Sequence, residues 1–146
     1  MVKSTEQVVE TEEIVDGRKF PNKAVLVSTG GDLNASPGDC VMVSLIIRND
    51  SNKPWKEGFH IESNYSTALM KQQFNEFKME LDAARTGESI EVDLPILIKD
   101  EALTCGQVGI NSFTCEFGVT NSNGVKVGQK MCVEIVITDG DEEEQL

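Results

Sequence analysis

The segment IIRNDSNKPW, residues 46–55, carries the strongest structural signal in the chain. Ile46 and Ile47 predict a strand, the Asn-x-Ser sequence after them predicts a turn, and the segment ends at Trp55, the only tryptophan. A strand, a polar turn and a tryptophan at this spacing are typical of one end of a β-sandwich, where the indole closes over the core. No residue set with catalytic chemistry lies nearby, so the segment favours a binding module over an enzyme.

The length and composition fit one domain with an aliphatic core. The chain has 146 residues, of which only 5% are aromatic, so the core must consist mainly of Val, Ile and Leu, which favour strands. Residues 1–20 show no sustained hydrophobic period, and we expect a disordered lead-in or linker there. We expect the sandwich at 21–138 and an acidic tail at 139–146.

Strand patterns recur along the chain and are separated by turn residues. The segment 66–82 is ambiguous, because Met70, Phe74, Phe77 and Leu81 fall at helical spacing while 77–81 alternate as a strand. We favour a short helical turn near 67–75 followed by a strand. Asn123-Gly124 between two alternating runs predicts a hairpin over 113–137. The predicted strands are 23–28, 40–49, 58–62, 76–82, 89–98, 113–120 and 125–137. About seven short strands predict an all-β, immunoglobulin-like antiparallel β-sandwich.

The charge of the chain restricts its partners. Acidic residues number 25 against 13 basic, giving a net charge of −12, which would repel nucleic acid and anionic membranes. A basic protein surface is the better electrostatic match. Five of the acidic residues lie in 139–146, and this tail is either a solvated end or a means of steering a basic partner. No signal peptide or spanning segment is visible, so we expect an intracellular protein, in the cytoplasm or the nucleus. The oligomeric state stays open.

The cysteines and the single histidine do not suggest a catalytic or metal site. Cys40, Cys105, Cys115 and Cys132 include no C-x-x-C pair, so we favour buried, reduced thiols over disulfides or metal ligands. His60 has no partner carboxylate at motif spacing and is expected to be a surface strand residue. We therefore predict no enzyme activity, no metal and no cofactor.

Several features along residues 37–137 together resemble a known family. They are the strand ending at Arg48-Asn49, Pro54-Trp55 with Gly58-Phe59, the turn Thr86-Gly87-Glu88, and the closing hairpin with Phe117-Gly118-Val119, Gly124, Val127-Gly128 and Met131-Cys132-Val133-Glu134-Ile135-Val136. The chain resembles the four-tryptophan domain, the immunoglobulin-like domain of the NBR-type autophagy cargo receptors. By spacing, the family's tryptophans would fall at Leu45, Trp55, Phe117 and Cys132. Only Trp55 is a tryptophan, and the other three remain apolar.

The resemblance implies a protein-binding platform within a larger protein. We predict a non-catalytic protein–protein interaction module that could dock cargo or another partner. The alternatives are a structural spacer subunit of a large assembly and an acidic binder of basic proteins.

The predicted partner contacts are Pro54, Trp55 and Phe59, because Pro54-Trp55 offers the largest rigid surface at this end. Trp55 is either a cap over the core or an exposed anchor for the partner. The predicted structural core comprises Leu45, Ile47, Trp55, Phe117, Cys132, Val133 and Ile135.

Overall fold

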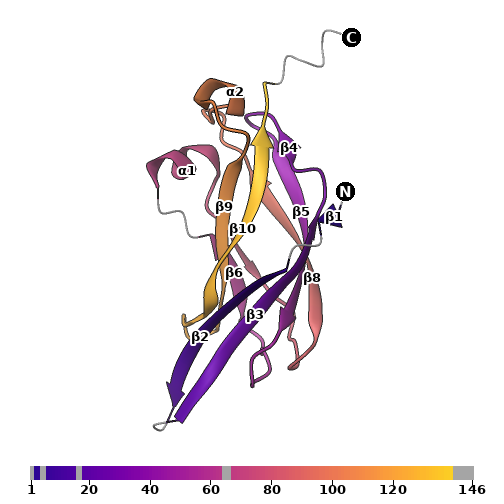
Figure 1. Cartoon of the computed structure of the whole chain (residues 1–146), viewed down its shortest axis with the longest axis vertical. Coiled ribbons are helices and arrows are strands. Elements are labelled where there is room, and N and C mark those ends of the chain that lie inside the picture. The colour runs from indigo at the N-terminus through magenta and orange to yellow at the C-terminus, as the bar shows by residue number, and fades with distance from the viewer. Residues whose placement is uncertain (1, 4–5, 16–17, 64–66, 140–146) are drawn as a thin grey trace.

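The computed structural model describes residues 2–3, 6–15, 18–63 and 67–139, and this part of the chain is an all-β sandwich (Figure 1). The described residues form ten strands and two short helices. The strands are β1 (Val2–Lys3), β2 (Gln7–Val15), β3 (Arg18–Gly30), β4 (Asn34–Ala35), β5 (Cys40–Asn49), β6 (His60–Ser63), β7 (Lys78–Glu80), β8 (Ser89–Leu97), β9 (Phe113–Thr120) and β10 (Lys126–Ile137). The helices are α1 (Ala68–Gln73) and α2 (Cys105–Val108).

The strands form two five-stranded sheets. The first has the order β1-β3-β5-β8, with β2 paired to β3, and the second has the order β4-β10-β9-β6-β7. The chain crosses from one sheet to the other after β3, and β4 then runs parallel to the end of β10. Gly31 makes the crossing with φ 105°, and a Cβ there would lie 2.6 Å from the Met42 carbonyl oxygen. Only glycine fits this close approach of two backbone segments.

The structure confirms the predicted all-β sandwich and its seven strands, with ends shifted by a few residues. The short helical turn predicted near 67–75 is α1, and the Thr67 hydroxyl oxygen caps it by accepting the Met70 N–H at 3.2 Å. The hairpin predicted over 113–137 is β9–β10. Its turn ends at Gly124, which has φ 83° and donates its N–H to the Asn121 carbonyl oxygen at 3.0 Å.

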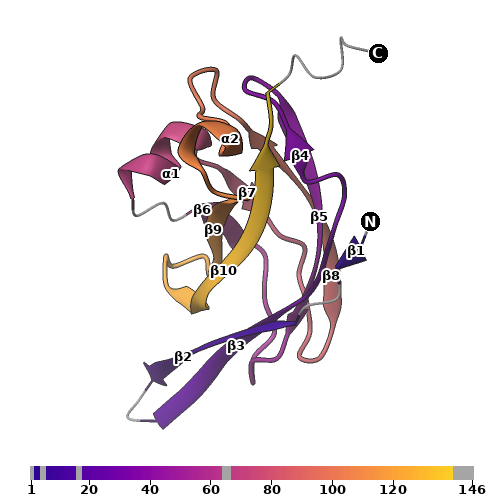
Figure 2. The same cartoon turned by 45° about the horizontal axis from the view of Figure 1, so that its top comes forward.

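The N-terminal segment differs from the expected disordered lead-in at 1–20. Strand β2 pairs with β3 in continuous register from Gln7 opposite Leu26 to Val15 opposite Arg18. Figures 1 and 2 show this hairpin projecting past the rest of the sandwich. Backbone hydrogen bonds to β3 hold β2 in place, and such bonds do not depend on a hydrophobic period in the sequence. At the other end, the predicted acidic tail lies outside the described residues apart from Asp139, which is exposed.

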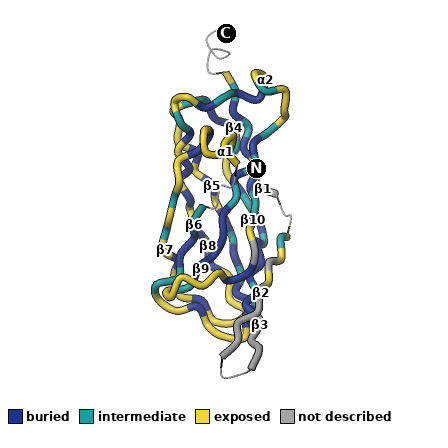
Figure 3. Tube along the Cα trace, turned by 90° about the vertical axis from the view of Figure 1, so that its left-hand side faces the viewer, coloured by how far each residue is buried: buried dark blue, intermediate teal, exposed yellow. Residues whose placement is uncertain are grey.

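The inner faces of the two sheets enclose one apolar core (Figure 3). Strands β5 and β8 alternate buried and exposed side chains, as expected for strands with one face on a core. Among the predicted core residues, those with at most 3% of their surface exposed are Leu45, Ile47, Trp55, Phe117, Val133 and Ile135.

Cys132 does not belong to this core, which corrects the prediction. It is half-buried, because the alternation that places Met131 and Val133 inside turns the residue between them to the outer face. The Gln7 side chain pairs with its backbone there, donating to the Cys132 carbonyl oxygen at 2.8 Å and accepting the Cys132 N–H at 2.9 Å. Burial, and then the nearby Glu116 carboxylate, raise the pKa of the Cys132 thiol.

The remaining cysteines divide between the inside and the surface. Cys105 and Cys115 are buried, as predicted, whereas Cys40 is exposed. Cys40 is the first residue of β5 and faces outward, so it is exposed although an apolar stretch of sequence follows it. In the described part of the chain the four cysteines form no disulfide.

Candidate functional site: the loop end

Three connections meet at the end of the sandwich from which the β2–β3 hairpin projects (Figure 1). They are residues 50–59 between β5 and β6, residues 81–88 between β7 and β8, and residues 121–125 between β9 and β10. We call these three segments together the loop end. The predicted contact residues all lie in the first of them.

Backbone hydrogen bonds join the first two loops into one unit. The Trp55 N–H donates to the Ala84 carbonyl oxygen at 2.7 Å, and the Ala84 N–H donates back to the Trp55 carbonyl oxygen at 3.0 Å. A second crossing lies nearer the sheet, where Gly87 and Glu88 exchange hydrogen bonds with Asn49 at 2.6 and 3.0 Å. Two crossings of this kind leave the paired loops little freedom to move apart.

Two buried polar side chains hold the first loop from inside. Asn49 is fully buried, and its amide nitrogen donates to the carbonyl oxygens of Lys53 and Ala84, each at 3.0 Å. The Asn49 amide oxygen accepts the Ser51 N–H at 2.9 Å. Ser51 is 2% exposed, and its hydroxyl both accepts the Lys23 N–H at 2.7 Å and donates to the Lys23 carbonyl oxygen at 3.1 Å. Since buried polar groups are costly unless hydrogen-bonded, this network fixes the loop conformation.

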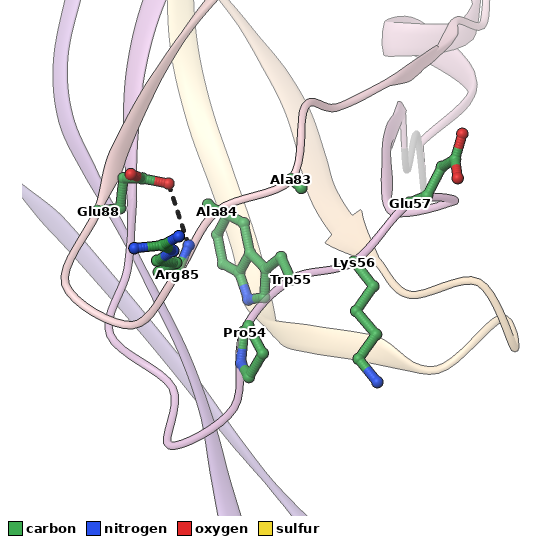
Figure 4. Close-up of a pocket in the computed structure, with 8 residues that line it drawn as sticks. All are labelled: Pro54, Trp55, Lys56, Glu57, Ala83, Ala84, Arg85 and Glu88. Atoms are coloured by element: carbon green, nitrogen blue, oxygen red, sulfur yellow. Dashed lines mark hydrogen bonds between the residues drawn. The ribbon is translucent and has the colours of Figure 1, made fainter.

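Trp55 is a core residue with one unusual feature. Its side chain is 2% exposed and stacks on Phe59, with ring centroids 6.0 Å apart and planes inclined by 22°. The indole Nε1 is buried and has no hydrogen-bond acceptor among the residues that the structure describes. Leaving such a donor without an acceptor costs roughly 1–3 kcal/mol. Figure 4 shows the indole nitrogen on the Pro54 side of the ring.

The paired loops are hollowed on both sides of the segment 54–56. The larger hollow measures about 700 Å³ and is shown in Figure 4. It is lined by Pro54, Trp55, Lys56, Glu57, Ala83, Ala84, Arg85 and Glu88. A second hollow of about 330 Å³ shares Pro54, Trp55 and Lys56, and it reaches Phe59 and the turn at 121–123. The Arg85 backbone N–H donates to the Glu88 carboxylate at 3.1 Å (dashed line in Figure 4). This hydrogen bond fixes the wall of the larger hollow that faces Pro54 and Trp55.

The charge at the loop end differs from that of the chain as a whole. The exposed side chains around the two hollows include Lys53, Lys56 and Arg85 against Glu57 and Glu88. With Asp50 and Asp82, which lie in the same loops, the loop end carries three basic and four acidic residues, a net charge of −1. An acidic partner is therefore repelled much less here than the net charge of −12 suggests.

The predicted contact residues fall into different environments. Pro54 is exposed, Phe59 is half-buried against the indole, and Trp55 is almost wholly buried. Of the two interpretations of Trp55, its burial supports the core cap. The segment 83–88, which forms the opposite wall of the larger hollow, was not predicted. It lies about thirty residues along the chain, and no local pattern indicates that it pairs with Trp55.

His60 lies in β6 beside the Gly58 carbonyl oxygen and the Glu62 carboxylate. His60 is 9% exposed, so the prediction of a surface residue is wrong. Its ring nitrogens lie 3.3 Å from the Gly58 carbonyl oxygen and 3.4 Å from a Glu62 carboxylate oxygen, and these groups accommodate the imidazole inside the sheet. In the described ranges, no three His, Cys, Asp or Glu side chains come close enough together to hold a metal ion.

The comparisons with known proteins do not assign a family. No protein-family model matches the chain, and no curated protein matches it. Within the described residues, neither helix has the length or the apolar character needed to cross a membrane.

Proposed function

We propose that this chain is a non-catalytic protein–protein interaction module whose partner docks at the loop end. The observation that carries the proposal is the preformed hollow of about 700 Å³ beside Trp55, which the exposed side chains of Pro54, Lys56 and Arg85 border. Binding sites are concave, largely formed in advance and furnished with a few well-placed polar groups. The loop end has each of these properties.

The internal bracing of the loops favours binding. Because Asn49 and Ser51 hold the backbone from within, the loops need little further ordering when a partner arrives. The conformational entropy lost on association is then small, and more of the contact energy becomes affinity. The side chains left to meet the partner are the exposed ones, Pro54, Lys56 and Arg85.

The exposed cations beside the hollow indicate the charge of the partner. The Trp55 indole nitrogen is buried, so Trp55 supports the wall of the hollow and does not donate to the partner. Lys56 and Arg85 are exposed donors, and they favour a partner group that carries negative charge.

The proposal includes the wider setting implied by the four-tryptophan family. A module of this kind works in the cytoplasm or nucleus as a cargo-docking platform of a larger protein. The spacer alternative predicts contacts only with neighbours in one parent assembly, and the acidic-binder alternative predicts partners that high salt releases.

Site-specific photo-crosslinking tests where the partner docks. A benzophenone amino acid is placed at position 56 or 85, and at position 71 on α1 as the matched control, since Lys71 is also an exposed lysine. In cells that express the chain, we expect a discrete adduct from positions 56 and 85 and none from 71. Lys56→Glu with Arg85→Glu should reduce that adduct at least about fivefold, whereas Lys71→Glu should not.

The outcomes separate the hypotheses. Adducts at position 71 and none at 56 or 85 would refute the loop end as the docking site. Adducts confined to one neighbour of a purified assembly would favour the spacer. The crosslinking is then repeated in a lysate at about 0.5 M salt. Loss of all adducts there, with charge reversal at 56 and 85 having no effect, would favour the acidic binder.

A further inference from the structure

A second exposed surface lies on the outer face of the first sheet, away from the loop end. In β5 and β8, Cys40 stands opposite Leu97, and Met42 stands opposite Pro95. All four side chains point outward, and Met42 and Leu97 are 52% and 49% exposed. We call these four residues the Met42 patch. Figure 2 shows β5 and β8 side by side along this face of the sandwich.

A polar pair separates the Met42 patch from Ile46, the other apolar residue on the outward positions of β5, which is half-buried and lies opposite Glu91. The next outward pair along the two strands is Ser44 opposite Asp93, joined by a hydrogen bond of 3.2 Å from the Ser44 hydroxyl. Arg48 opposite Ser89 is the last pair of these two strands and lies next to the loop end. Single exposed apolar residues are ordinary, but four adjacent ones with polar surroundings mark an interaction surface.

Carboxylates border the patch on two sides. Glu91 and Asp93 precede Pro95 on the outward positions of β8 and are exposed. On the other side, Asp32 and Asp39 line a hollow of about 330 Å³ together with Cys40 and Met42. Asn34 donates to the Asp32 carboxylate from its side chain at 3.0 Å and from its backbone at 3.2 Å, which lowers the pKa of Asp32 and keeps it charged.

The surroundings indicate how an occupant would approach. Proline has no N–H to offer a new strand, and charged side chains on an edge strand discourage pairing. Pro95, Glu91 and Asp93 therefore protect the edge of β8, so an occupant would lie on the sheet face. A second copy of this chain is disfavoured, because each copy would bring its own acidic border and a net charge of −12.

We propose that the Met42 patch docks a basic segment of a partner protein, in which apolar side chains cover Met42 and Leu97 while flanking Lys or Arg residues meet the bordering carboxylates. The apolar contact provides the affinity, and the charge complementarity provides the specificity and a faster association. This surface is separate from the loop end, so the two sites are tested independently.

Two amphipathic peptides of defined sequence provide the probe. They share the same leucine positions, and one carries lysine where the other carries glutamate. We expect the full chain to bind the lysine peptide in fluorescence anisotropy at low salt and not the glutamate peptide. The double variant Met42→Ser with Leu97→Ser should weaken binding about tenfold, and Glu91→Gln with Asp93→Asn about threefold. The control Ile110→Ser, which changes an apolar residue that is 39% exposed and belongs to neither proposed surface, should have no effect.

A second set of measurements locates the bound peptide. Cys40 lies within the patch, so the bound lysine peptide should slow its alkylation, as mapped by mass spectrometry. A variant with neutral residues at Asp141, Glu142, Glu143 and Glu144 should bind normally and show the same protection. Binding that is lost in this tail variant but retained in the Met42/Leu97 variant would overturn the proposal. So would equal binding of both peptides, or concentration-dependent dimers that the Met42/Leu97 variant abolishes.

Discussion

The loop end and the Met42 patch present surfaces in opposite ways. The loop end is irregular backbone, and its shape depends on side chains underneath it, namely Asn49, Ser51 and Trp55. The Met42 patch is regular sheet, and its shape depends only on the pairing of β5 with β8. Substitutions beneath the loop end should therefore cost stability, whereas substitutions in the patch should alter binding and leave the fold intact.

The largest contrast is expected between Trp55→Ala and Met42→Ala. Removing a buried indole should lower the free energy of unfolding by about 3–5 kcal/mol, a large part of the roughly 5–15 kcal/mol of a typical domain. Met42 is half-exposed, and its truncation should change stability by less than about 0.5 kcal/mol. Urea unfolding followed by far-ultraviolet circular dichroism measures both, since Trp55 is the only tryptophan and its loss removes the fluorescence signal. A cost below about 1 kcal/mol for Trp55→Ala would show that the indole is not a structural cap.

A smaller contrast is expected between two asparagines. Asn49→Ala leaves the carbonyl oxygens of Lys53 and Ala84 without their donor and the Ser51 N–H without its acceptor. We expect a loss of roughly 2–4 kcal/mol, because these groups lie in or beside the interior. Asn34 makes its side-chain hydrogen bond to Asp32 at the surface, so Asn34→Ala should cost less than about 1 kcal/mol. Equal effects at the two positions would contradict the view that the loop end is braced from inside.

The sandwich could be predicted from the sequence wherever a segment has one face on the core. The alternation in β5 and β8 and the Asn123-Gly124 turn are local signals, and the structure follows them. The β2–β3 hairpin could not be predicted, because backbone pairing with β3 places β2, and that pairing leaves no period in the sequence. Cys132 was misplaced for a simpler reason: Val133 beside it was also assigned to the core, and adjacent strand residues face opposite sides.

The candidate site was only half visible in the sequence. The first wall, with Pro54 and Trp55, is one continuous segment and could be recognised from its residues. The second wall, at 83–88, depends on the pairing of Trp55 with Ala84, a contact between distant parts of the chain. The Met42 patch likewise arises from register, since Leu97 comes opposite Cys40 only when β5 and β8 are aligned. Neither the pairing of Trp55 with Ala84 nor the register of β5 and β8 can be predicted from a local sequence pattern.

The smallest expected effect concerns the place where the outer sheet face meets the loop end. The Arg48 side chain makes two hydrogen bonds to the Asp50 carboxylate, at 2.8 and 3.1 Å, and these bonds lower the pKa of Asp50. A carboxyl whose pKa is lowered by folding stabilises the fold above its unfolded-state pKa of about 4, and this contribution disappears as the pH falls through the folded-state value. The pair is partly exposed, so Asp50→Asn should cost about 0.2–1 kcal/mol at neutral pH and low salt.

The pH and salt dependence distinguishes this ion pair from simple packing. The difference in unfolding free energy between Asp50→Asn and the unmodified protein should shrink below about pH 4, because the carboxyl of the unmodified protein then becomes protonated. It should also shrink at about 1 M salt, which screens exposed charges. Asp82→Asn, an exposed carboxylate of the same loop end, serves as the control. A cost for Asp50→Asn that stays constant from neutral to acid pH would mean that Asp50 acts through shape. The bracing of the loop end would then extend beyond Asn49 and Ser51 to the sheet face that leads to the Met42 patch.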